Sequence, residues 1–224
     1  MECIELFSIP LYKFKFEGHK DHKNSFMQYL SNDEIYKKNT SPGNALNFTA
    51  PNLHQEDIFK PFVDFSMFSL KSVMDDLGFL PSIQMTGLWA TRHINNGSHH
   101  RHTHGNSFLA GVYYLHGTSY NSGTIFYNTH KYHNYIIPAR KPEAHMKIHN
   151  SYASKFEEGC LYIFPSWLEH STGMNNLAMT NAVRHILSFN AMPLGKTNHD
   201  EFDRYDYQEA SPENMITYRE DRFK

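Results

Sequence analysis

The chain has 224 residues, 40% of them hydrophobic, which is enough for a single domain with a buried core. A formal net charge of −2 without long basic runs gives no broad electrostatic footprint for nucleic acid, and two cysteines are too few for the disulfide framework of a secreted domain. Because the first residues lack the pattern of a signal peptide and no apolar run reaches the length of a membrane span, we expect a cytoplasmic protein without a membrane partner.

The N-terminal region, residues 1–82, predicts a strand and helices that pack on the barrel described below. Apolar residues alternate over 2–16 and predict a strand, which Pro10 confines to the edge of a sheet. Residues 20–38 have a weak helical pattern. Residues 39–54 are rich in turn-forming side chains and predict an irregular connection, which is also a candidate lid.

A regular amphipathic helix is predicted over residues 60–77. Its apolar residues recur at steps of three and four, which places them on one face of a helix. Gly78 follows directly and is suited to end the helix. We expect this helix to cover one face of a sheet.

The central region, residues 83–193, contains short apolar segments separated by turn residues. Strands at this spacing, in a chain with 15% aromatic residues, favour a β-sandwich or barrel. The predicted strands are 83–94, 107–116, 123–127, 134–137, 145–149, 160–165 and 182–191. Residues 194–224 form an acidic tail that we expect to wrap the surface or to be partly ordered, and all three regions together are expected to form one compact domain.

Four histidines precede the predicted strand 107–116. In an extended segment alternate side chains share a face, so His102 and His104 are expected to point the same way. Imidazole is the commonest protein ligand of transition metals, whereas the alternative for such a pair is a solvated loop. His99 and His100 are expected to be solvated or to support the pair.

Two further residues complete a pattern that suggests chemistry. His170 lies at the exit of the predicted buried strand 160–165, and Arg184 begins a strand on which it shares a face with Ser188 and Asn190. A buried arginine is costly unless it meets an anion. Each residue alone is more typical of a structural role, as a hydrogen-bonded histidine or a salt bridge, but their order along the β-strands favours a metal centre.

This pattern resembles the double-stranded β-helix (jelly-roll, cupin-like) oxygenases that use Fe(II) and 2-oxoglutarate. The chain is most similar to one such family of bacteria and their viruses, over about residues 83–193. Three blocks carry the similarity: His102-Thr103-His104 followed by Ser107 to Leu115, Gly159 to His170 with its Phe164-Pro165-Ser166-Trp167-Leu168 centre, and Arg184 to Asn190, which ends in Ser188-Phe189-Asn190.

The resemblance implies a mainly β fold with flanking helices and a dioxygenase that oxidises an unidentified small molecule or peptide, releasing succinate and CO2. Its cofactors would be Fe(II), 2-oxoglutarate and O2. The implied metal ligands are His102, His104 and His170. Arg184 would bind the distal carboxylate of 2-oxoglutarate, with Tyr114 and Ser188 as further donors. No catalytic residue beyond the metal site is predicted.

The sequence departs from the usual ligand pattern of these oxygenases at one position. His104 stands where most of them have an acid, so three neutral imidazoles would hold the iron unless a carboxylate completes the set. Glu169 and Glu143 are the candidates for such a carboxylate. The segment 116–158, rich in His, Tyr and Lys, is a second candidate lid, and its composition does not identify a substrate class.

Two other functions fit parts of the pattern. Gly159, Pro165 and His170 resemble the second motif of a cupin that does not use 2-oxoglutarate, but the glutamate expected after His104 is absent. A non-enzymatic zinc-stabilised binding protein would need a closed site, usually with four ligands and often with cysteine. The two cysteines of the chain do not have the spacing of metal ligands.

Overall fold

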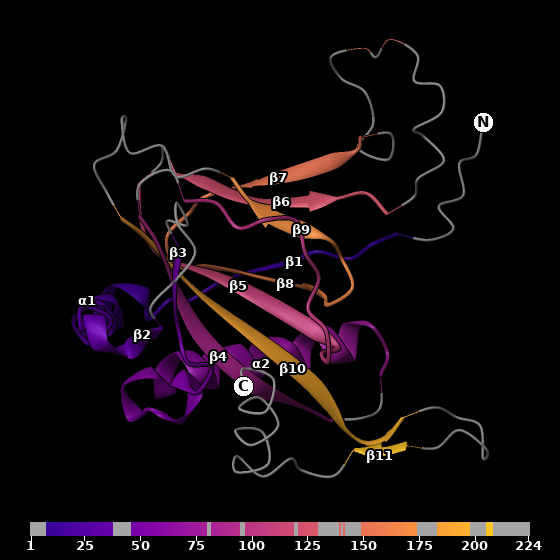
Figure 1. Cartoon of the computed structure of the whole chain (residues 1–224). Helices are drawn as coiled ribbons and strands as arrows, with labels where there is room; N and C mark the ends of the chain where they lie inside the picture. Colours follow the sequence, from indigo (N-terminus) through magenta and orange to yellow (C-terminus); the bar gives the residue numbers. More distant parts are fainter. Residues whose placement is uncertain are drawn as a thin grey trace.

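Two antiparallel β-sheets face each other, and two helices cover the outer side of the larger sheet (Figure 1). The computed structural model describes residues 8–37, 46–79, 82–94, 97–118, 121–129, 139, 141, 149–173, 183–197 and 205–207. The fold is mainly β with flanking helices, as the sequence predicts.

The larger sheet has the order β1-β8-β5-β10-β4-β3-β2, and β11 pairs with β10. Its strands are β1 (Tyr12–Lys15), β2 (Tyr36–Lys37), β3 (Leu46–Thr49), β4 (Ser82–His93), β5 (Leu109–His116), β8 (Cys160–Pro165), β10 (Arg184–Thr197) and β11 (Tyr205–Tyr207). The long strand β10 lies between β4 and β5, so its side chains are enclosed by neighbours on both sides.

The smaller sheet has the order β7-β6-β9, with β7 (Ser151–Lys155), β6 (Ser122–Tyr127) and β9 (His170–Thr172). An antiparallel bridge between His102 and His170 extends this sheet by the segment that precedes β5. The chain therefore passes between the two sheets repeatedly, which is the arrangement of a double-stranded β-helix.

The helices are α1 (His19–Tyr29) and α2 (Lys60–Asp76), with short 3-10 turns at Asp33–Ile35, Leu53–Gln55 and Asp57–Phe59. Helix α2 confirms the amphipathic helix predicted over 60–77. Pro61 lies in its first turn, where a missing N–H costs nothing, and Gly78 follows its end with φ of 74°. No helix in the described part of the chain is long and apolar enough to cross a membrane.

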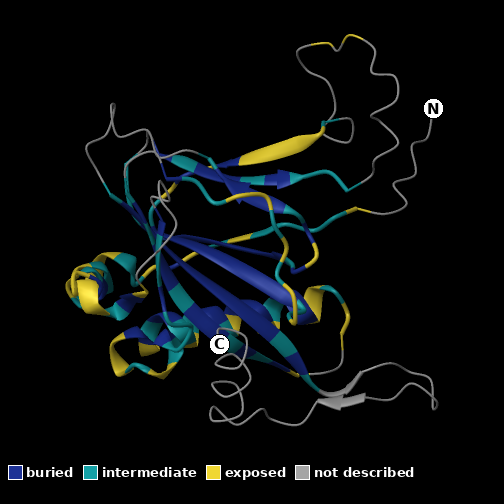
Figure 2. Cartoon of the chain, viewed as in Figure 1, coloured by how far each residue is buried: buried dark blue, intermediate teal, exposed yellow. Residues whose placement is uncertain are grey.

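Strand β5 is buried along most of its length (Figure 2). It separates two hydrophobic cores, because its alternate side chains point to opposite faces. Leu109, Tyr113 and Leu115 pack in the core beneath the helices. Val112 and Tyr114 pack in the second core, between the two sheets. The second core forms the interior of the barrel.

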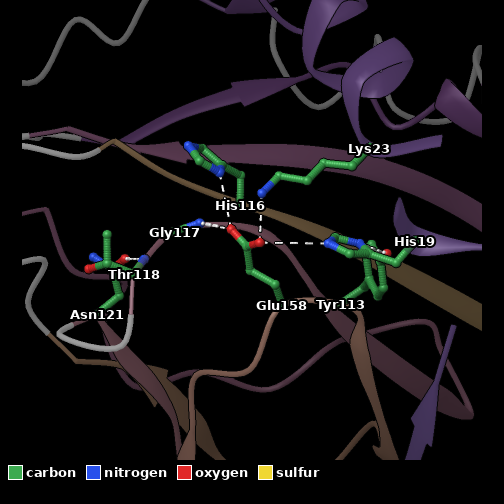
Figure 3. A network of polar contacts seen from close by, with 8 residues as sticks. All are labelled: His19, Lys23, Tyr113, His116, Gly117, Thr118, Asn121 and Glu158. Carbon is green, nitrogen blue, oxygen red and sulfur yellow. Dashed lines mark hydrogen bonds and ion pairs between the residues drawn. The ribbon is translucent and has the colours of Figure 1, made fainter. Parts of the chain in front are cut away.

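A polar network around Glu158 joins α1 to the end of β5 and to the turn before β8 (Figure 3). Its carboxylate accepts hydrogen bonds from Lys23 at 2.6 Å and from the backbone N–H of Gly117 at 2.8 Å, and it lies 3.1 Å from His116 Nδ1. His19 Nε2 lies 3.7 Å from the same carboxylate. The network anchors α1 on the barrel.

One sequence prediction needs correction, two strands were missed, and two predicted strands are not tested. Residues 46–49 belong to the predicted irregular connection but form β3, because their backbone pairs with β4. Strands β7 and β9 were not predicted, since β7 is polar and largely exposed and β9 is only three residues long. The predicted strands 134–137 and 145–149 lie outside the described residues, apart from position 149.

Candidate functional site

Three histidines meet where the segment before β5 pairs with β9. The backbones of His102 and His170 exchange two hydrogen bonds of 2.9 Å, and the N–H of His104 donates to the carbonyl of Ser166 at 2.9 Å. Arg101 and Thr103 are exposed, whereas His102 and His104 are partly buried. The alternation expected from the sequence is therefore present, and it turns both imidazoles towards His170.

The ring nitrogens of these histidines converge. One nitrogen of each of His102, His104 and His170 lies within 4.8 Å of the others, and the Nε2 atoms of His104 and His170 are 3.2 Å apart. This is the one group of three or more potential metal ligands that the described residues bring together. A divalent cation could be held by all three nitrogens.

The opposite nitrogen of each ring has an oxygen partner. His102 Nδ1 lies 2.6 Å from the carbonyl oxygen of His100, and His170 Nδ1 lies 2.9 Å from that of Leu168. His104 Nδ1 lies 2.6 Å from Asn190 Oδ1. Since oxygen acceptors need a proton on Nδ1, each neutral ring has a bare Nε2. Metal-binding histidines commonly have such a partner on the other nitrogen.

Burial keeps these imidazoles neutral. It lowers the pKa of His104 to about 4 and that of His170 to about 3, and it also lowers the pKa of His102. The ring of His99 packs against that of His102, with centroids 3.9 Å apart, and burial lowers the pKa of His99 to about 4. At neutral pH the rings therefore carry lone pairs that can bind a metal.

Of the two carboxylates considered as additional ligands, Glu169 does not join this group. Glu169 is paired with Arg101, whose guanidinium lies 4.2 Å from the ring centre of Tyr127. This pair flanks His102 and His170 and links the two segments that bear them. Glu143 lies outside the described residues.

Arg184 is buried at the other end of the inward face of β10, with 1% of its surface exposed. Its guanidinium donates to the carbonyls of Ser122 and Gly173 and lies 2.7 Å from His93 Nδ1. None of the carboxylates in the described ranges forms a salt bridge with it, and its Nε has no hydrogen-bond partner. Burial lowers its pKa to about 10, so it remains a cation at neutral pH, and none of the described residues supplies an anion for it.

The two other residues predicted to bind the co-substrate are also inside the barrel. The Tyr114 hydroxyl donates to Thr124 Oγ1 at 3.0 Å, lies 2.6 Å from Ser154 Oγ and accepts the Thr124 N–H at 2.8 Å. Ser188 is buried on β10, on the same face as Arg184 and between its cross-strand neighbours on β4 and β5. Both positions face the space between the sheets.

Sequence reasoning missed the partners of the site residues. His93 and the carbonyls around Arg184 come from distant segments and leave no local pattern. Asn190 was predicted to share a face with Arg184, and this face-sharing was the available indication that it belongs to the site. Its contact with His104 joins residues 86 positions apart.

Comparisons with known proteins agree with this geometry. Residues 87–190 match the family model described as "Putative 2OG-Fe(II) oxygenase". No curated protein matches the chain. Among solved structures, the chain is similar to SnoN, a non-haem α-ketoglutarate-dependent epimerase from nogalamycin biosynthesis, with a TM-score of 0.64, 12% identity and coverage of 91% of this chain and 92% of SnoN.

Two other solved structures share the fold. HygX from Streptomyces hygroscopicus, determined with nickel, 2-oxoglutarate and hygromycin B bound, has a TM-score of 0.57 and 12% identity, and the match covers 83% of each chain. A prolyl-4-hydroxylase from Pseudomonas putida has a TM-score of 0.55 and 11% identity, with coverage of 82% of this chain and 93% of the hydroxylase. At these identities the structures establish the double-stranded β-helix fold, and residues 87–190 match the family model of the 2-oxoglutarate- and Fe(II)-dependent oxygenases, so that fold and family match together indicate a non-haem iron oxygenase.

Proposed function

We propose that His102, His104 and His170 hold the Fe(II) of this oxygenase and that Arg184 binds the distal carboxylate of 2-oxoglutarate. The proposal rests on one observation. The inward side of β10 runs between three bare imidazole nitrogens and a buried guanidinium that has no carboxylate partner among the described residues. One end has donors for a cation and the other has a charge that needs an anion. A metal ion and a dicarboxylate together satisfy both ends.

The donor set suits a divalent transition metal. Three neutral imidazoles add no negative charge, so the two carboxylates of 2-oxoglutarate would offset most, but not all, of the positive charge of Fe(II) and Arg184. The Nε2 atoms of His104 and His170, 3.2 Å apart, direct lone pairs at each other when both Nδ1 atoms carry protons. A cation between them removes that repulsion.

Arg184 suits a carboxylate because its guanidinium can form two parallel hydrogen bonds, and burial strengthens such a pair. His93 holds the guanidinium from β4 at 2.7 Å. We assign Tyr114 and Ser188 as further donors to the same carboxylate. The burial of both side chains inside the barrel supports this assignment, as does the position of Ser188 on the face of β10 that bears Arg184.

When bound, Fe(II) and 2-oxoglutarate would supply, with O2 as the oxidant, the chemistry that inserts one oxygen atom of O2 into a substrate C–H bond while 2-oxoglutarate is converted to succinate and CO2. The chain positions and shields these groups. The histidines present lone pairs, Arg184 neutralises and orients the co-substrate, and the apolar side chains between the sheets exclude water. The substrate is an unidentified small molecule or peptide, and the low cysteine content favours a cytoplasmic location.

The test is release of succinate from 2-oxoglutarate with Fe(II) and ascorbate, together with anaerobic binding of 2-oxoglutarate to the Fe(II) form. We expect succinate and a visible charge-transfer band. His170→Ala should remove both, whereas the matched control Glu158→Gln, on the outer side of the larger sheet, should keep both. If the wild-type protein formed neither the band nor succinate, the proposal would be wrong, and a cupin without 2-oxoglutarate or a structural zinc site would replace it.

A further inference from the structure

We propose that Asn190 is a positioning residue that selects the tautomer of His104 and so makes this histidine a metal ligand. The inference deepens the proposed function and rests on it. It starts from the hydrogen bond of 2.6 Å between His104 Nδ1, in the segment before β5, and Asn190 Oδ1, on β10.

The other two histidines of the site need no such selection. His102 and His170 have backbone carbonyls as their Nδ1 partners, and a carbonyl only accepts. Their protons are therefore on Nδ1 and their Nε2 atoms are bare. His104 instead faces an amide side chain, which presents an acceptor oxygen on one side and a donor nitrogen on the other.

The orientation of this amide has opposite consequences for the site. With Oδ1 towards the ring, His104 carries its proton on Nδ1 and directs a bare Nε2 at the point where the three rings converge. With Nδ2 towards the ring, the proton would move to Nε2 and would be donated to His170 Nε2, 3.2 Å away. That second arrangement would occupy two ligand nitrogens with one hydrogen bond. The structure has Oδ1 towards the ring.

The fold holds Asn190 in place for this contact. Its side chain is buried, with 6% exposed, and its cross-strand neighbours are Gly87 on β4 and Ala110 on β5, two of the smallest residues. The pairing of β10 with β4 shifts register directly after Asn190, and such irregularities redirect side chains. The Trp89 ring, 5.7 Å from that of His104, packs against the same imidazole. His104 is thus held by both an apolar ring and a hydrogen-bond acceptor.

The first test measures Co(II) binding to the metal-free chain by absorption titration. Asn190→Leu removes the acceptor at similar volume and should weaken Co(II) binding by about 10- to 100-fold and alter the d–d spectrum. Asn190→Asp keeps an oxygen acceptor and should bind within about threefold of wild type or more tightly. Phe189→Leu, the next residue on β10 but in the core on the opposite face, is the matched control and should leave affinity and spectrum unchanged.

The second test needs no variant of Asn190. Nuclear magnetic resonance of the metal-free wild-type chain with 15N-labelled histidine, with His104 assigned through His104→Gln, should show a protonated Nδ1 and a bare Nε2. A proton on Nε2 would overturn the inference, as would wild-type Co(II) affinity in a folded Asn190→Leu or an equal loss in Asn190→Asp. If these tests succeed but the wild type releases no succinate, the proposed reaction fails while the role of Asn190 stands.

Discussion

Two clusters of histidines in this molecule have the same residue type and opposite surroundings. Around Glu158, His19 and His116 face a carboxylate that Lys23 also contacts, and His19 Nδ1 lies 2.6 Å from the Tyr113 hydroxyl (Figure 3). In the three-histidine site the Nδ1 atoms have oxygen partners, while the Nε2 atoms face one another.

This difference shows what separates a structural histidine from a candidate ligand. In the Glu158 cluster the protein itself already supplies a negative charge. Desolvation would raise the pKa of Glu158, but the hydrogen bonds and charges of Lys23 and the other partners outweigh this effect and lower the pKa. In the site no carboxylate of the described residues joins the group, so the lone pairs are left for a cation. The partner of the second ring nitrogen therefore distinguishes a structural histidine from a candidate metal ligand better than the number of histidines does.

The largest effect is expected from removing a ligand. His104→Ala or His170→Ala should abolish succinate release and weaken Fe(II) binding by about 100-fold or more, because two imidazoles cannot replace three. Iron stoichiometry after desalting and the succinate assay measure this. Full iron content and activity in His104→Ala would show that a different group completes the ligand set.

The metal-free chain should lose stability in acid. Burial lowers the pKa of His99, His170 and His185 to about 4, 3 and 4, below the value near 6.5 in the unfolded chain. Above pH 6.5 these histidines are neutral in both the folded and the unfolded chain, and the folded state keeps its full stability. As the pH falls towards 4, the unfolded chain binds protons that the folded chain does not, so the free energy of unfolding decreases. Each should contribute up to about 1.4 kcal/mol per pH unit.

Urea unfolding at pH 7.5, 6.0 and 5.0 measures this loss, which we expect to total several kcal/mol. Excess Zn(II) should raise the free energy of unfolding at pH 7.5 and much less at pH 5.0, because protons compete for the same nitrogens. A pH-independent free energy of unfolding would contradict the neutral, buried state of these rings.

Substitution of Arg184 should weaken the binding of 2-oxoglutarate without affecting the binding of the metal. Arg184→Lys removes the bidentate hydrogen bonding to the distal carboxylate and should raise the KM for 2-oxoglutarate by about 10- to 100-fold. The reason is that a hydrogen bond to a charged group contributes about 1.5–3 kcal/mol. Co(II) affinity without 2-oxoglutarate should stay near the wild-type value. An unchanged KM would assign the distal carboxylate to another residue.

The smallest effect is expected in the structural cluster. Glu158→Gln keeps only one of the two oxygens that accept from Gly117 and Lys23, replaces the other with an amide NH2 and removes the negative charge. It should lower the free energy of unfolding by about 1 kcal/mol. Thermal unfolding measures this change. Metal affinity and succinate release should stay at wild-type values, and a loss of either would mean that the two clusters are coupled.

The sequence predicted most of the elements that carry the site. Alternation placed His102 and His104 on one side, and the strand pattern placed Arg184, Ser188 and Asn190 on one face. The 3.6-residue period predicted helix α2. These predictions succeeded because each depends on backbone periodicity within one segment. The division of the chain at residues 82 and 193 remains a prediction.

Elements that depend on partners could not be predicted in this way. Strand β3 lies in a segment rich in turn residues and exists through its pairing with β4. Strand β9 has three residues, and its pairing with β6 and with His102 defines it. A short segment has too few residues to show a period, so its structure is decided by the neighbour that satisfies its backbone hydrogen bonds.

The sequence by itself determined which residue types were available for chemistry and on which face of each strand they lie, and it carries the match of residues 87–190 to the oxygenase family model. The tertiary structure decided their electrostatic state. It brought Asn190 to His104 across 86 residues and left Arg184 buried beside His93 without a paired carboxylate among the described residues. The physical reason is that periodicity is a property of one segment, whereas desolvation and hydrogen-bond partners arise when distant segments pack together.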